Sequence, residues 1–194
     1  MLLLVIGLVL FLGAHSVRVL APSWRERFIA ARGEKPWKGL VTLASLAGFV
    51  AIVRGFALAR QDAVVLWTPP TWAPHLTGAL VLLAFVLVAA AYVPGNLLKA
   101  KIHHPMVAGT KAWAFAHLLA NGRLADAVLF GSFLAWAILD FAASRRRDRA
   151  QGVTYAPGRL APTVITVLAG LAAGLAFALW AHLGLFGVAP FAAR

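Results

Sequence analysis

Residues 103–122 read HHPMVAGTKAWAFAHLLANG, and the interpretation of the fold depends on this stretch. Pro105 suits the first turn of a helix and disfavours helical backbone in the residue before it. The Asn-Gly pair at the end is typical of a turn. The stretch therefore predicts a short helix that starts near His104 and ends before the Asn-Gly pair. An imidazole in an apolar segment costs free energy unless it finds a partner, so His117 is a candidate functional residue.

The composition is that of an integral membrane protein. Of the 194 residues, 62% are hydrophobic and only 12% are charged, whereas soluble domains have about 25% charged residues. The net charge of +12 comes from basic residues that lie between apolar stretches. This distribution is a topology signal and argues against nucleic acid as a partner. The chain has no cysteine, which excludes disulfides, thiolate metal sites and cysteine nucleophiles.

The hydrophobic pattern predicts an all-α integral membrane protein, a bundle of about six transmembrane helices of which the fourth is short. Residues 1–194 are expected to form a single membrane domain. The first apolar segment has no basic residues before it and no clear cleavage site after it, so it is expected to be a retained span. The polar residues 18–38 are expected to form a loop. The six expected elements lie at residues 1–17, 39–58, 76–93, 103–122, 124–143 and 162–188.

The basic residues predict the orientation of these elements. If the N-terminus is outside, segments 18–38, 94–111 and 144–159 are inside and carry six, three and five basic residues, 14 of the 18 in the chain. Both termini are therefore expected on the outer side. An alternative fuses residues 111–141 into one long helix, but it would place the basic cluster at 145–149 outside. The Asn-Gly pair also favours a break.

Depth in the membrane limits which histidines could share a metal ion or haem. His15 lies near the inner end of the first span, and His117 lies about 9 Å deep if Lys111 marks the interface, which resembles the depth of His15. His182, near the outer end of the last span, matches His117 only if the short helix starts at His104. His104 itself is about 20 Å from His117 along a helix, so these two cannot share one iron. A lone membrane histidine is also often a hydrogen-bonded tie between helices.

Six motifs follow one another along the chain: LGAHSVR (12–18), WKGL (37–40), SLAGF (45–49), YVPGN (92–96), HPM (104–106) and AHLLANG (116–122). In this order they resemble the NnrU family. The resemblance covers about residues 3–145, an NnrU-like core to which a transmembrane helix at about 161–188 is added. The family is associated with bacterial denitrification, which implies a multi-pass protein of the bacterial inner (plasma) membrane. It is related to plant 15-cis-ζ-carotene isomerase, an integral membrane haem b enzyme.

The resemblance implies a cofactor and its ligands. By position, the haem ligands of the isomerase match His15 and His117, so the resemblance implies haem b with these two histidines as metal ligands. Arg18 or Lys111 would pair with the haem propionates near the inner interface. His104 would either support a ligand from outside or stack on the partner of a propionate.

The same resemblance implies redox or isomerase-type chemistry on an apolar small molecule in the lipid bilayer. The isomerase has a cysteine three residues before the second histidine, whereas this chain has Ala114, so a thiolate cannot serve as an alternative ligand. The alternative function is that of a non-catalytic membrane accessory protein. In that case the histidines tie helices together and the basic loops recruit partners.

Overall fold

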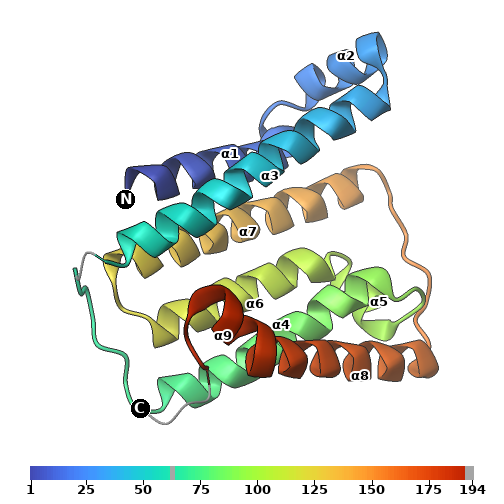
Figure 1. Ribbon diagram of the computed structural model, residues 1–194. Helices are drawn as coiled ribbons and strands as arrows, with labels where there is room; N and C mark the ends of the chain where they lie inside the picture. Colours follow the sequence, from blue (N-terminus) through green and yellow to red (C-terminus); the bar gives the residue numbers. More distant parts are fainter. Residues whose placement is uncertain (62–63, 191–194) are drawn as a thin grey trace. The chain divides into compact units, whose positions relative to one another are not determined.

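The computed structural model describes residues 1–61 and 64–190, and these fold into helices without any strand (Figure 1). Five segments are long and apolar enough to span a membrane: α1, α3, α4, α7 and the continuous stretch from α8 to α9. The expected all-α, membrane-type fold class is confirmed. The helices are α1 (Leu2–Leu20), α2 (Pro22–Arg32), α3 (Glu34–Ala59), α4 (Ala73–Tyr92), α5 (Leu97–Ile102), α6 (Pro105–Ala120), α7 (Leu124–Ala150), α8 (Leu160–Ala176), the π-helix η1 (Phe177–Ala181) and α9 (His182–Phe186).

The chain divides into two compact units. The first contains Met1–Leu66 and Arg123–Ser132, that is, α1 to α3 and the beginning of α7. The second contains Trp67–Gly122 and the chain from Phe133 onward, that is, α4 to α6, the rest of α7 and the C-terminal helices.

Glycines allow α1 and α3 to approach closely in the first unit. A Cβ atom on Gly7 of α1 would lie 2.6 Å from the backbone nitrogen of Ile52 on α3. A Cβ atom on Gly48 of α3 would lie 2.7 Å from the backbone nitrogen of Phe11 on α1. The residue numbers rise along α1 as they fall along α3, from Gly7 against Ile52 to Phe11 against Gly48, so the two helices run antiparallel. Because backbone meets backbone at these points, any side chain there would push the helices apart.

Residues 18–38 were expected to be a loop, and this expectation is wrong, since they contain helix α2. The polar composition conceals two helix signals, a proline at the first helical position and Gly33 after the last. Gly33 has a φ of 87°, which glycine adopts without strain. The rings of Trp24, Phe28 and Trp37 gather with centroids 5.5 to 5.9 Å apart. Such amphipathic rings are typical of the membrane–water interface.

In the second unit, α6 packs antiparallel along α4. A Cβ atom on Gly109 would lie 2.9 Å from the carbonyl oxygen of Ala84. Seven residues further along α6, the carbonyl of Ala116 accepts a hydrogen bond of 2.9 Å from the Thr77 hydroxyl, seven residues back along α4. Although α6 has only 16 residues, it therefore follows α4 over most of its own length.

Helix α8 also packs antiparallel on α4, through two glycines. Gly170 lies against the backbone of Val86, and a Cβ atom on Gly174 would lie 2.9 Å from a methyl carbon of Leu82. These two glycines, four residues apart on α8, therefore mark a close contact between α8 and α4.

Helices α6 and α7 are separated by a turn that is bonded to the α3–α4 connection. In the second unit the amide of Trp67 donates to the carbonyl of Gly122 at 3.2 Å. In the first unit the amide of Leu124 donates to the carbonyl of Val64 at 2.9 Å. The alternative of one helix over residues 111–141 is therefore wrong, and the break predicted from the Asn-Gly pair is confirmed.

Helix α7 continues to Ala150, beyond the end expected at residue 143. The basic run is thus helical and not a loop. Arginine is a good helix former, and cations near a helix C-terminus interact favourably with the helix dipole.

Candidate functional site

His15 lies in the last two turns of α1, in the first unit. Its Nδ1 is 2.7 Å from the carbonyl oxygen of Phe11, four residues earlier on the same helix. Because a carbonyl oxygen only accepts, Nδ1 carries the proton, and Nε2 carries the lone pair with which imidazole binds metals. The Phe11 ring lies against the imidazole, with centroids 4.4 Å apart.

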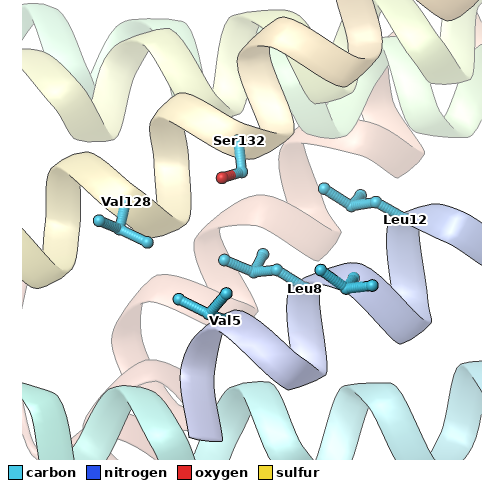
Figure 2. A pocket seen from close by; sticks show the side chains of 6 residues that line it. Val5, Leu8, Leu12, Val128 and Ser132 are labelled. Atoms are coloured by element: carbon cyan, nitrogen blue, oxygen red, sulfur yellow. The ribbon is translucent and has the colours of Figure 1, made fainter. Parts of the chain in front are cut away.

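An apolar groove of about 380 Å³ lies in the first unit, between α1 and the beginning of α7 (Figure 2). Its volume is in the range of small-molecule sites. Residues three apart share one side of a helix, so His15 continues the side that Leu12 presents to the groove. The lining residues are Val5, Leu8, Val9, Leu12, Val128 and Ser132.

His117 lies in the last turn of α6, in the second unit, and is held in the same way as His15. Its Nδ1 is 2.9 Å from the carbonyl oxygen of Trp113, four residues earlier, so Nδ1 again carries the proton. The Trp113 ring lies 5.3 Å from the imidazole between centroids and packs edge-on against Phe133 at 5.4 Å. Both histidines thus follow an aromatic residue by four positions and direct the same ring nitrogen to their own helix.

The two basic residues expected to accompany the cofactor lie near these histidines in the sequence. Arg18 is in the last turn of α1, three residues after His15. The Lys111 ammonium lies 3.8 Å from the ring centroid of Phe141, which is a cation–π contact. Lys111 precedes His117 by six residues, about 9 Å along the helix.

The most densely bonded polar group in the second unit lies at the other end of α6. We call it the polar cluster: His103, His104, Arg145, Asp148 and Tyr155. His104 Nε2 donates to a carboxylate oxygen of Asp148 at 2.7 Å. The Tyr155 hydroxyl donates to the same oxygen at 2.9 Å. The Arg145 guanidinium donates to His103 Nδ1 at 2.8 Å. The cluster joins the α5–α6 junction, the end of α7 and the segment that follows it.

Two features of the polar cluster have a physical consequence. His103 has a φ of 69°, a conformation that a residue with a side chain rarely adopts. Its ring stacks on Tyr155 with centroids 4.0 Å apart and planes 9° from parallel, which holds the turn in place. Burial raises the pKa of the Tyr155 phenol, and the hydrogen bond to the Asp148 carboxylate raises it further.

The expected site residues thus fall into separate places. His15 and Arg18 belong to the first unit, and His117 and Lys111 to the second. His104 bonds Asp148 at the opposite end of α6 from His117. Within the described residues, no three His, Cys, Asp or Glu side chains gather to hold a metal.

Sequence reasoning missed Arg145, Asp148 and Tyr155 as members of one cluster. They lie more than 40 residues from the histidines, and only folding brings the segments together. One signal was present: Asp148 is the only acidic residue in the basic run, and a carboxylate there needs a local reason.

Comparison with curated proteins and with solved structures finds no match. The model of one protein family, described as NnrU protein, matches residues 3–190. The match extends over the C-terminal helices as well as over the motifs that first suggested the resemblance. Since it spans nearly the whole sequence, the chain belongs to the NnrU family.

Proposed function

We propose that this protein binds haem b, whose iron His15 and His117 would hold. One observation carries the proposal: both imidazoles donate from Nδ1 to the carbonyl four residues earlier. A metal-ligating histidine usually donates its other ring N–H to a carbonyl, carboxylate or water, because this bond fixes the ring and leaves Nε2 as the donor atom. Two imidazoles are an established pattern of donors to haem iron.

The surroundings of each histidine suit a large apolar cofactor. Phe11 and Trp113 pack on the two imidazoles and limit their rotation. Arg18 and Lys111 would be the cations that pair with the haem propionates. Arginine at such a position offers paired donors, whereas lysine acts as a single point charge.

Bound haem supplies redox or Lewis-acid chemistry, and the ligand set and burial tune its potential. The substrate side of the proposal is an apolar small molecule, for which the groove beside α1 offers a lining of five aliphatic side chains and one hydroxyl. With both imidazoles bound, chemistry on such a molecule requires one histidine to leave. The family resemblance alone supports isomerase-type chemistry and a link to denitrification.

We also propose that α6 crosses the membrane, so that six elements span it and both termini lie outside, in the bacterial inner membrane. Helix α6 is shorter than the roughly 20 residues a span normally needs. Its course along α4 and the position of its last turn beside the α3–α4 connection support a crossing. The distribution of basic residues supports the same orientation.

The competing function is a non-catalytic accessory protein in which the histidines only tie helices together. The Nδ1 bonds fit a ligand role, because each fixes the imidazole within its own helix.

The test is the absorption spectrum of the purified protein, oxidised and reduced with dithionite, after haem addition. We expect a haem b spectrum whose reduced bands change or disappear in His15→Ala and in His117→Ala. His75→Ala is the matched control, because His75 is exposed at the start of α4. A protein that stays colourless with added haem would contradict the proposal and favour the accessory function.

A further inference from the structure

The end of α7 carries four arginines and one carboxylate, in the order RRRDR (145–149). Arg145 lies three residues before Asp148, a spacing at which two side chains on a helix are neighbours. The Arg145 guanidinium donates instead to His103 Nδ1 at 2.8 Å, and Asp148 accepts from two other members of the polar cluster. In the part of the chain that the structure describes, no arginine of this run forms an ion pair with an acidic side chain.

Contacts with α6 fix the side of α7 that faces the rest of the second unit. The Phe133 ring packs edge-on against Trp113 with centroids 5.4 Å apart. The Lys111 ammonium lies 3.8 Å from the ring centroid of Phe141, and Asp148 is bonded into the polar cluster. These three residues of α7 are spaced by about two helical turns each, so they lie along one side of the helix.

The opposite side of α7 is exposed, and its chemistry changes along its length. Ile138 is 51% exposed and Leu139 is 66% exposed, whereas two turns later the same side carries arginines. The acidic residues in this part of the helix lie on other sides, Asp140 about 160° and Asp148 about 120° around the axis from Ala142. We call the exposed side the outer face of α7. In chain order it consists of Ala135, Ile138, Leu139, Ala142, Arg146 and Arg149.

The outer face of α7 is complementary to one class of molecule, an anionic phospholipid. Its apolar part suits acyl chains, and its two arginines offer the paired donors that bind a phosphate group. Arg146 follows Ala142 by one turn, about 6 Å along the helix, so apolar and cationic parts are continuous. A zwitterionic headgroup would bring its own positive charge to these arginines, whereas an anionic headgroup compensates them.

We propose that the outer face of α7 binds an anionic phospholipid, with the phosphate on Arg146 and Arg149 and an acyl chain along Ile138, Leu139 and Ala142. The polar cluster contributes indirectly, because it holds Asp148 away from these arginines. The site lies wholly within the second unit and does not depend on bound haem.

The experiment detects the lipid at the site by fluorescence quenching in vesicles. Ala135→Cys places the only thiol of the chain on the outer face, for attachment of a fluorophore. The vesicles are phosphatidylcholine to which either phosphatidylglycerol or phosphatidylcholine with brominated acyl chains is added. Each basic residue near a membrane surface favours anionic lipid about fivefold, so we expect half-quenching at a mole fraction of brominated phosphatidylglycerol on the order of tenfold lower. High salt should reduce this preference.

Two substitutions test the arginines on the labelled protein. Arg146→Gln/Arg149→Gln should abolish the preference, and Arg146→Lys/Arg149→Lys should retain most of it. Arg27→Gln/Arg54→Gln is the control, because it removes the same charge from exposed positions of the first unit.

A label on α4 shows whether any preference belongs to the site. Leu83→Cys places the fluorophore at a side chain that is 47% exposed, and there the two brominated lipids should quench equally. Equal quenching at position 135 in the protein with both arginines would overturn the proposal. A preference that survives Arg146→Gln/Arg149→Gln, or one that high salt leaves unchanged, would overturn the role of the arginines. If the glutamine variant does not fold, the lysine variant and the salt dependence still decide the question.

Discussion

The Asp148 side chain connects two segments of the polar cluster. A single carboxylate oxygen accepts from His104 and from Tyr155, and the two donors come from segments on either side of α7. Charge-assisted hydrogen bonds are stronger than neutral ones, so Asp148 holds His104 and Tyr155 in the polar cluster.

The titration of Tyr155 tests this arrangement. In the native state the phenol proton is held more tightly than in the unfolded chain, because burial and then the bond to Asp148 raise the pKa. The resulting stability is present below the unfolded pKa of about 10 and is lost as the pH rises through the folded pKa. We expect Asp148→Asn to move the titration of Tyr155 to lower pH.

The measurement is phenolate absorbance against pH. The chain has two tyrosines. The protein with Asp148 and the Asp148→Asn variant should therefore both carry Tyr92→Phe, which leaves Tyr155 as the only phenol. An identical titration curve with and without the Asp148 carboxylate would show that the hydrogen bond does not form in solution.

At the scale of helices, the close contact of α1 and α3 gives a second prediction. In Gly7→Ala the new methyl group would lie 2.6 Å from backbone of α3, and overpacking of this kind costs about 1–3 kcal/mol. Gly13→Ala is the matched control on the same helix, because no described atom lies within 4 Å of its Cβ position. We expect thermal unfolding in detergent to occur at lower temperature in Gly7→Ala only. Equal transitions in the two variants would mean that α1 and α3 are not in contact.

The elements differ in how far the sequence could predict them. The apolar spans were predictable, because a run of about 20 apolar residues is long enough to cross a bilayer as a helix and is uncommon in soluble proteins. Helix α2 was not, since its polar residues match a loop in composition and only Pro22 and Gly33 mark its ends. The sequence singled out His117 by its apolar surroundings and His15 by its depth in the first span. It did not predict the bond from His104 to Asp148, because that contact depends on tertiary structure.

At the scale of the whole molecule, the remaining question is which ends of the helices share a side of the membrane. If α6 crosses, residues 61 and 123 lie on the outer side and residue 151 lies inside. If α6 does not cross, residue 123 lies inside and residue 151 lies outside with residue 61. The α6–α7 turn is bonded to the α3–α4 connection in both units, and these two segments must therefore be on one side. We expect α6 to cross.

The absence of cysteine makes this prediction directly measurable, because each introduced thiol is the only one in the chain. Gln61→Cys, Arg123→Cys and Gln151→Cys place thiols at exposed positions. In intact spheroplasts a membrane-impermeant maleimide should label residues 61 and 123, and should label residue 151 only after the membrane is opened. Labelling of residues 61 and 151 without residue 123 would mean that α6 turns back. The basic end of α7 would then face outward against the positive-inside rule, and the polar cluster would lie outside with it.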